Sequence, residues 1–438
     1  MANPQRWRFW HLAAVVAAAA TLIYVQTWWF DFTHLDDNDL ILKQQASLRQ
    51  VASLYSVFGR TYFGAASTSY YRPIVNLSLV LDAQWSGAHA FGYHVTNVLL
   101  HAAASALTLA LMLRLGLRKP AAVWATLLFA LHPVHAGSVA WIPGRNDVLM
   151  TCFALGACLC LLQDADRPGW RRKTLHLSCW LLALLCKETA LCLPLLFVAL
   201  LWATGMPREP LGQRWLWLGY GGVLALYVAA RSTVVAASHA GTVTQFGIAL
   251  LRLPVLVSDL GKLLLPVRLQ VLAAPRDAHL WPGLMALAAI ALLLWRLPAL
   301  RNRAVGFALS CTILPMLVSL LGAERVVLEN RLYLSTVGIG ILLGHALQAV
   351  QDQPRRWGRG LQAVAVGVLL VLGSTTLRYS RSFQDRGRFA QAAITASPSS
   401  GLAVNLLRRC SLAAARNATH GPSSTSAFTP GRRDPDPR

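Results

Sequence analysis

Residues 9–30 read FWHLAAVVAAAATLIYVQTWWF, an uninterrupted apolar stretch near the start of a 438-residue chain. A stretch of this length is about what one helix needs to cross a bilayer. Arg6 and Arg8 precede it, and the positive-inside bias predicts that this end is cytoplasmic. Asp36 and Asp37 follow it, so we predict an acidic pair on the opposite face of the membrane.

The composition is that of a membrane protein rather than a soluble one. Hydrophobic residues make up 55% of the chain and charged residues 13%, whereas about a quarter of a soluble protein is charged. The mean hydropathy is +0.47. Because apolar stretches recur between short arginine-rich loops, we predict an all-α integral membrane protein with about eleven transmembrane helices. The predicted spans lie near residues 9–30, 94–113, 120–137, 148–162, 174–186, 189–205, 215–235, 282–297, 304–322, 332–349 and 360–377.

The net charge of +22 does not indicate a nucleic-acid-binding protein. The basic residues are dispersed among the loops between apolar stretches and are not gathered on one face. Anionic lipid headgroups are therefore their expected partners. The eight cysteines show no zinc or disulfide spacing, and no cofactor is predicted. A divalent cation beside the acidic pair stays an alternative, although hard cations want more oxygen ligands than the sequence assigns.

The longest predicted loop between spans covers residues 31–93, on the outer face. A loop this long is uncommon unless it is functional. It contains two predicted surface helices, Leu48–Phe58 and Pro73–Trp85. Residues 248–272 are apolar but carry charges, and they are predicted to form an interfacial or re-entrant helix pair broken at prolines.

The chain divides into three predicted regions. Residues 1–378 form the membrane domain, and residues 379–400 form a short helical segment outside the membrane. Residues 401–438 are rich in Arg, Ser and Pro towards their end, and we predict a disordered tail.

Polar side chains gather at the outer ends of the predicted spans. Ionisable groups within a membrane are costly and usually functional or paired, so their placement on one side favours a single outward-facing site. Each group also has a structural interpretation, because an Asp pair can cap a helix and His or Asn can tie helices together. The candidates are Asp36, Asp37, Arg72, His94, Asn97, His101, His132, His135, Arg145, Asn146, Asp147, Lys187, Glu188, Glu329, Asn330, Arg331 and Tyr333.

Seven strings along the chain carry a family resemblance. They are LDDNDLIL, YYRPIVNLSLVLDAQWSG, FGYHVTNVLLHAAAS, LFALHPVHAGSVAWIPGRNDVL, CKETALCLP, NRLYLSTVG and FQDRGRFAQAAI. In this order, from about residue 30 to 400, they resemble the multi-spanning O-mannosyltransferases with tetratricopeptide repeats that act on cadherins, and their bacterial relatives. The combination is specific, although no single string is. The resemblance implies a GT-C-like bundle that transfers mannose from dolichyl-phosphate mannose to Ser or Thr of a protein.

Two positions depart from the pattern of that family. Gly137 stands where the family usually has an acid, and Ser335 stands where it usually has proline. The repeat array that normally follows the membrane domain is predicted to be reduced to half a helical hairpin. Recognition of the acceptor would then differ from that in the family.

The same residues suit sugar transfer on chemical grounds. A hydroxyl that attacks a sugar phosphate needs a carboxylate base, which Asp36 or Asp37 supplies, with Asp37 as first choice. The leaving phosphate develops negative charge that a fixed guanidinium can stabilise. The predicted phosphate ligands are, in order, Arg331, Arg72, Lys187 and Arg145. Supporting roles are predicted for His94, Asn97, His132, His135, Asp147, Glu188 and Tyr333.

These observations predict a membrane glycosyltransferase that uses a polyprenyl-phosphate-linked sugar and a protein acceptor. The composition favours a bacterial inner membrane with the site facing the periplasm, or the endoplasmic reticulum in a eukaryote. A lipid-carrier flippase or transporter is one alternative, but it would show internal repeats and polar groups at mid-depth. A non-catalytic membrane scaffold is the other alternative, and it would tolerate Gly137.

Overall fold

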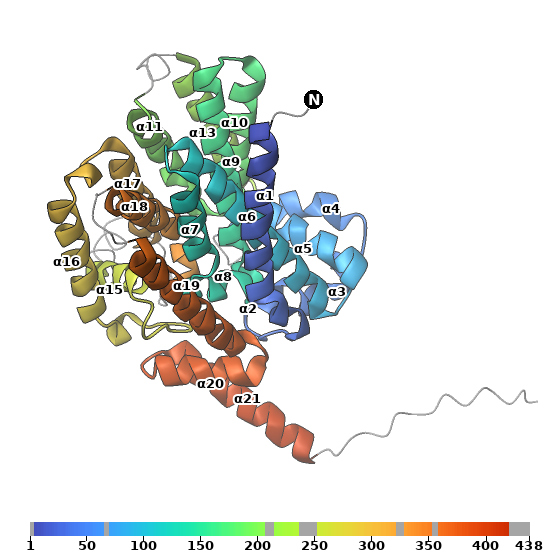
Figure 1. The fold of residues 1–438 in the computed structure, drawn as a ribbon. Helices are drawn as coiled ribbons and strands as arrows, with labels where there is room; N and C mark the ends of the chain where they lie inside the picture. The colour runs from blue at the N-terminus through green and yellow to red at the C-terminus, as the bar shows by residue number, and fades with distance from the viewer. Residues whose placement is uncertain are drawn as a thin grey trace, which may run out of the picture.

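The computed structural model describes residues 4–64, 70–205, 214–235, 252–320, 328–352 and 358–419, which fold almost entirely as helices (Figure 1). The longer helices of the first half are α1 (Pro4–Tyr24), α5 (Pro73–Ser86), α6 (Ala90–Arg114), α7 (Lys119–Ala130), α9 (Arg145–Asp166), α10 (Trp170–Leu184) and α11 (Leu193–Ala203). Those of the second half are α13 (Arg214–Ser232), α15 (Leu253–Leu264), α16 (Trp281–Arg296), α17 (Arg303–Leu320), α18 (Tyr333–Gln351), α19 (Gly358–Ser380), α20 (Arg386–Ala396) and α21 (Gly401–Thr419). The prediction of an all-α membrane protein is confirmed.

Six helical stretches of the described chain are long and apolar enough to cross a membrane. They are Phe9–Trp29, Ala90–Arg114, Ile142–Asp166, Arg303–Leu320, Glu329–Gln351 and Gly360–Phe383. A bent pair, Lys119–Ala130 with Pro133–Val139, makes a seventh if it counts as one span. The other four predicted spans are helices too, but α11 and α16 have only 11 and 16 residues. The predicted count of eleven is therefore not confirmed.

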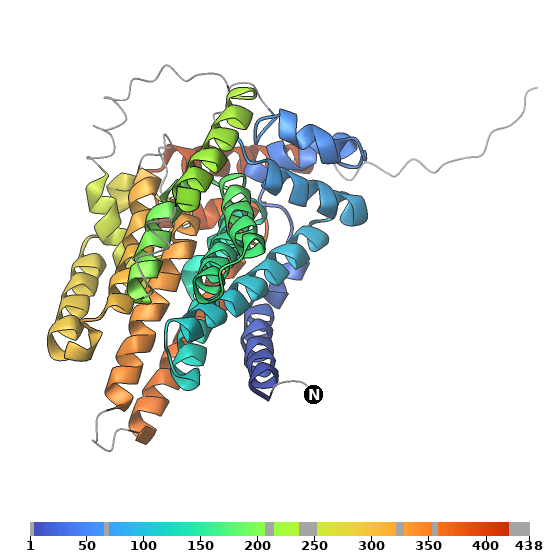
Figure 2. The same cartoon turned by 90° about the horizontal axis from the view of Figure 1, so that it is seen from above.

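The helices pack as one bundle around α6, α9, α17 and α18. Helix α6 contacts α1, α7 and α9, while α17 contacts α11 and α18. The N-terminus and the α20–α21 pair lie at opposite ends of the bundle in Figure 1. Both views place α16 on the opposite side of the bundle from the small helices of the first loop (Figure 2).

The bend after α7 shapes the end of the bundle at which α9 begins. Pro133 lacks an N–H and disfavours helical geometry in the preceding residue, and His132 is extended, with φ −73° and ψ 124°. The short helices η4 (Pro133–His135), α8 (Ala136–Val139) and η5 (Ile142–Gly144) follow. A Cβ on Gly144 would lie 2.0 Å from the carbonyl oxygen of Gly137, so only glycine allows this close turn into α9.

The first loop differs from the prediction in one of its two helices. Helix α5 confirms the predicted Pro73–Trp85 helix, whereas Leu48–Phe58 is not continuous. It is divided among α3 (Gln45–Leu48), α4 (Ser53–Ser56) and η3 (Val57–Gly59). The Ser53 hydroxyl donates to the carbonyl of Ser47 at 2.5 Å, and serine side chains that bond the backbone compete with helix formation. The turn between the predicted helices lies partly outside the described residues.

Two further segments also differ from the prediction. Within 248–272, the described part forms one helix, α15, which ends before Pro266. Helix α21 lies where a disordered tail was predicted from residue 401. It forms because Ala403 and Leu406 recur at helical spacing and are buried against the bundle. The predicted disorder of residues 420–438 lies outside the described residues.

Candidate functional site

Polar and charged side chains from distant parts of the chain meet at one end of the bundle. Lys187, in extended backbone after α10, places its ammonium 2.5 Å from a carboxylate oxygen of Asp147, in the first turn of α9. The Asn330 side-chain amide donates to that oxygen at 2.9 Å. Asn330 belongs to η9 (Glu329–Leu332), which also carries Arg331. Lys187 and Asp147 are both buried.

Arg72 and Glu188 form the neighbouring ion pair. The Arg72 guanidinium donates to one Glu188 oxygen at 2.9 and 3.2 Å, and it lies 5.0 Å from the centroid of the Tyr62 ring and 4.5 Å from that of Tyr70. Burial, the largest single effect, acts to lower the pKa of Arg72, but Glu188, Tyr62 and Tyr70 together outweigh it and the pKa is raised. Arg72 is therefore a permanent cation held in an aromatic and acidic setting.

Three cations of this cluster act on one another. The pKa of Lys187 is lowered by burial and by the nearby charges of Arg72 and Arg331, against the opposing effect of Asp147. Arg72 and Lys187 pair with Glu188 and Asp147, and Arg331 also acts on the carboxylate of Asp259. Fixed cations gathered in this way can stabilise an anion that binds among them. Arg331 also donates to the carbonyl of Ser319 at 3.2 Å.

The predicted acidic pair begins α2 (Asp36–Leu40), and its two members have different surroundings. One oxygen of Asp37 accepts from the Thr33 amide at 2.9 Å and from its hydroxyl at 2.5 Å. The other oxygen is buried without a hydrogen-bond partner. Burial raises the pKa of Asp37 to about 6. Asp36 is half-buried and lines an open hollow.

Tyr62 connects the acidic pair to the cationic cluster. Its ring contacts the Arg72 guanidinium, and its hydroxyl pKa is raised mainly by burial, with contributions from the charges of Asp36 and Asp37. Tyr62 therefore contacts Arg72 and lies within range of the charges of Asp36 and Asp37. Among the described residues, no three His, Cys, Asp or Glu side chains are arranged to hold a metal ion.

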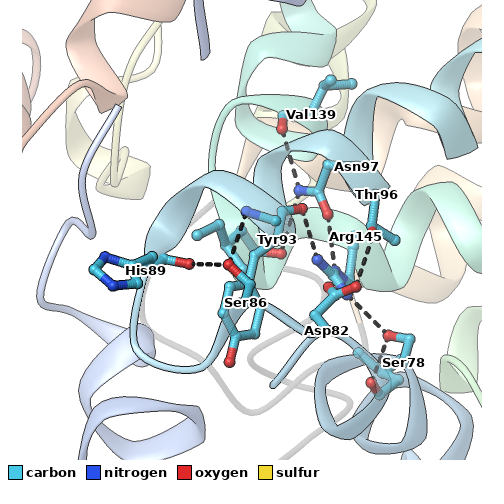
Figure 3. Close-up of polar contacts among 12 residues, drawn as sticks. Ser78, Asp82, Ser86, His89, Tyr93, Thr96, Asn97, Val139 and Arg145 are labelled. Carbon is cyan, nitrogen blue, oxygen red and sulfur yellow. Dashed lines mark hydrogen bonds and ion pairs between the residues drawn. The ribbon is translucent and has the colours of Figure 1, made fainter. Parts of the chain in front are cut away.

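Arg145 lies in a separate buried network (Figure 3). It pairs with Asp82 at 2.5 Å and donates to the Asn97 side chain and to the Tyr93 carbonyl, both at 2.8 Å. Asn97 in turn donates to the Val139 carbonyl at 3.1 Å. Arg145 is fully buried, so in this structure it connects α5, α6 and α9, and its role in binding phosphate stays a prediction.

The predicted supporting histidines tie helices together. His132 contacts the Leu263 carbonyl at 3.1 Å, and His135 contacts the Thr336 hydroxyl at 2.7 Å. The Tyr333 hydroxyl meets His101 at 2.6 Å. His94 is buried with its ring edge-on to Phe30. Their contribution to a reaction stays a prediction.

The structure gives roles to polar residues that had no assigned role in the prediction. Asn330, one of the polar residues predicted at an outer helix end, bonds Asp147. Asp82 was not predicted, because its partner Arg145 is far away along the chain. Gly137 faces a small hollow that Glu329 also lines. Glu329 is held by Lys262 at 3.1 Å and by the Tyr379 hydroxyl at 2.9 Å. A carboxylate thus stands beside Gly137, contributed by another element.

Comparison with known proteins matches part of this chain to mannosyltransferases. The family model described as dolichyl-phosphate-mannose-protein mannosyltransferase matches residues 80–233. Mouse protein O-mannosyl-transferase TMTC4 is 31% identical over 207 residues, which cover 41% of this chain and 28% of the relative. Human protein O-mannosyl-transferase TMTC2 is 33% identical over 173 residues, which cover 37% of this chain and 20% of the relative.

The fruit fly Drosophila melanogaster has a further relative, protein O-mannosyl-transferase Tmtc1, which is 32% identical over 179 residues. The matched part spans only about a fifth to a quarter of the length of these relatives. The matched region contains Arg145, Asp147 and Lys187. Over this part of its length, the chain resembles the O-mannosyltransferases, as its sequence strings predict.

Proposed function

We propose that this protein transfers a sugar from a polyprenyl-phosphate carrier to a Ser or Thr hydroxyl of a protein on the non-cytoplasmic face of a membrane. The observation that carries the proposal is the cationic cluster of Arg72, Lys187 and Arg331, whose Arg72 contacts the ring of Tyr62. Tyr62 in turn lies within range of the charges of the acidic pair. A sugar phosphate needs an anion site and a base within reach of one another. The names of the relatives support mannose as the sugar.

The transfer is a substitution at the anomeric carbon of the sugar. The bond between that carbon and the phosphate oxygen breaks, and the polyprenyl phosphate leaves with the electron pair. The acceptor hydroxyl forms the new bond, and its proton passes to a carboxylate and then to water. The cluster stabilises the charge on the leaving phosphate, and such preorganised donors typically contribute a few kcal/mol each.

The surroundings of the two acids favour Asp36 as the base. A base must lie within hydrogen-bond reach of the hydroxyl that it deprotonates, and Asp36 lines an open hollow. Asp37 is fully buried and bonded to Thr33, which suits a residue that holds the start of α2 in place. This choice reverses the order that the sequence suggests, although both acids keep a role.

The test is transfer of radiolabelled mannose from a polyprenyl-phosphate donor to a Ser/Thr peptide by the purified protein in liposomes. We expect Asp36→Asn to lower the transfer rate by about 10²–10⁴-fold, as loss of a general base does. The transfer rate of Asp37→Asn should fall by a smaller factor. Asp31→Asn, an exposed acid of the same loop, is the matched control.

The double variant, Asp36→Asn with Asp37→Asn, tests whether the acidic pair supplies the base at all. If it inserts normally and transfers sugar at the wild-type rate, the acidic pair is not the base. If neither it nor the wild type consumes any polyprenyl-phosphate sugar, the enzymatic proposal fails and a scaffold becomes the better interpretation.

A further inference from the structure

The hollow that Asp36 lines is bounded on its other side by the helices that follow the last span. It has a volume of about 200 Å³ and lies between α2 on one side and α20 and α21 on the other. Its polar lining comes mainly from Asp36, Asp39, Lys43, Arg386, Asn405 and Arg409. The hollow therefore joins the proposed base to a helix pair that the cationic cluster does not use.

The α20–α21 pair is fixed firmly enough to form a wall. The Asp31 amide donates to the Gln384 carbonyl at 2.8 Å, which ties the first loop to the segment before α20. Phe389 of α20 stacks on Trp141 with ring centroids 6.2 Å apart. Leu406 of α21 is buried in the same cluster. These contacts hold the polar residues of α20 and α21 opposite α2.

The wall carries cationic groups with unused hydrogen-bonding capacity. The Arg386 Nε is buried and has no hydrogen-bond partner in the structure. A buried donor left unpaired is costly, so a ligand that brings an acceptor atom gains from the contact. Arg409 and Asn405 are exposed on α21, and both line the hollow. The wall opposite Asp36 thus offers donors to a carbonyl or carboxylate oxygen.

We propose that this hollow binds the acceptor polypeptide, with its Ser or Thr hydroxyl at Asp36 and an adjacent backbone carbonyl or acidic side chain at Arg386 and Arg409. The assignment rests on the proposed transferase function. The hydroxyl must approach the base through an open space, and this hollow is such a space at Asp36. An acidic residue next to the acceptor hydroxyl would satisfy the guanidinium groups as a charge-assisted pair.

Steady-state transfer to two peptides tests this assignment. One peptide carries Glu beside the acceptor Thr, and the other carries Gln there. We expect the wild type to favour the Glu peptide, and Arg409→Ala to raise the KM for that peptide about tenfold, as loss of a hydrogen bond to a charged group does. The KM for the lipid-linked sugar should stay unchanged in this variant. Arg408→Ala, an exposed neighbour outside the hollow, is the matched control.

Charge reversal at Arg409 provides a second test. Its readout is an inverted peptide preference, which a misfolded variant would not show. Arg409→Glu should invert the preference, so that a peptide with Lys beside the acceptor Thr is used better than the Glu peptide. If the wild type transfers sugar but Arg409→Ala and Arg409→Glu keep the KM and preference of Arg408→Ala, the acceptor assignment is wrong while the transferase stands. A wild type that transfers no sugar would overturn both.

Discussion

At the residue scale, burial separates side chains that look alike in sequence. Arg145 is enclosed by Asp82, Asn97 and backbone carbonyls, and a buried charge without such partners would be strongly destabilising. Arg72 and Lys187 have acidic partners too, but they share their surroundings with a further cation. The difference lies in the balance of charge around each group, which no single position reveals.

Burial of Asp37 makes the stability of the folded protein depend on pH. Burial raises its pKa in the folded protein to about 6 from an ordinary value of 3.8, despite bonds from Thr33 and the charge of His34. Between these values the folded state binds more protons than the unfolded state, so stability rises as pH falls from about 6 towards 4. The gain is at most about 3 kcal/mol.

We therefore expect Asp37→Asn to unfold at a higher temperature than the wild type near neutral pH, with the difference closing at about pH 4.5. Thermal unfolding in detergent at both pH values measures this. Asp39→Asn, at an exposed position of the same helix, is the control. A difference between Asp37→Asn and the wild type that stays constant with pH would show that Asp37 is ionised at both pH values.

At the element scale, the sequence predicts helices where a local signal exists and fails where the signal is distant. Apolar stretches and Pro133 mark α6, α7 and α9 because hydrophobic length and missing N–H groups act locally. The ends of α3 and α4 depend on a serine bond to the backbone. Helix α21 depends on a surface, formed by Trp141 and Phe30, that only the folded bundle provides.

The turn into α9 depends on a glycine that sequence alone does not single out. A Cβ on Gly144 would lie 2.0 Å from the carbonyl oxygen of Gly137, and backbone atoms cannot move aside cheaply. We expect Gly144→Ala to destabilise the protein by about 1–3 kcal/mol, as overpacking does. It should also lower activity, because Asp147 follows directly in α9. Thermal unfolding and sugar transfer measure the two effects.

Gly367→Ala is the matched control, since nothing lies within 4 Å of its added Cβ and Gly367 is inside helix α19. Alanine is the better helix former by about 1 kcal/mol, so this variant should be neutral or more stable. Equal effects of the two substitutions would mean that the close approach at Gly144 relaxes without cost.

At the scale of the whole molecule, the candidate site could be predicted by residue type but not by pairing. The charged residues at the outer helix ends were visible in the sequence, because ionisable groups stand out among apolar ones. Their partners were not, since Arg72 and Glu188 are 116 residues apart, and Asp147 and Asn330 are 183 apart. Only the folded bundle shows that Arg72 and Lys187 gather around Asp147, whereas Arg145 pairs elsewhere.

One hydrogen bond also constrains the number of crossings. Asp31 follows the first candidate span and Gln384 follows the last, and their backbone bond of 2.8 Å places both on one side of the membrane. The number of crossings between them is therefore even, and the total is odd. Six spans do not satisfy this, whereas seven do if the bent pair Lys119–Val139 crosses. Four further helices of the described chain, α10, α11, α13 and α16, leave the parity unchanged if all of them cross.

This parity makes a labelling prediction about sidedness. Tyr55 in the first loop and Ser399 between α20 and α21 are exposed, and with an odd number of crossings both should lie opposite the N-terminus, which the charge bias predicts to be cytoplasmic. Trp170, the first residue of α10 and part of a basic stretch, is exposed as well and should be cytoplasmic. We expect a membrane-impermeant maleimide to label Tyr55→Cys and Ser399→Cys on intact cells or spheroplasts, and to label Trp170→Cys only after permeabilisation.

The half-buried Cys410 is replaced by Ser in every variant, so that its own labelling is not mistaken for that of the introduced thiol. Labelling of Trp170→Cys together with Tyr55→Cys from outside would mean that the bent pair turns back without crossing, and opposite labelling of Tyr55→Cys and Ser399→Cys would contradict the bond between Asp31 and Gln384.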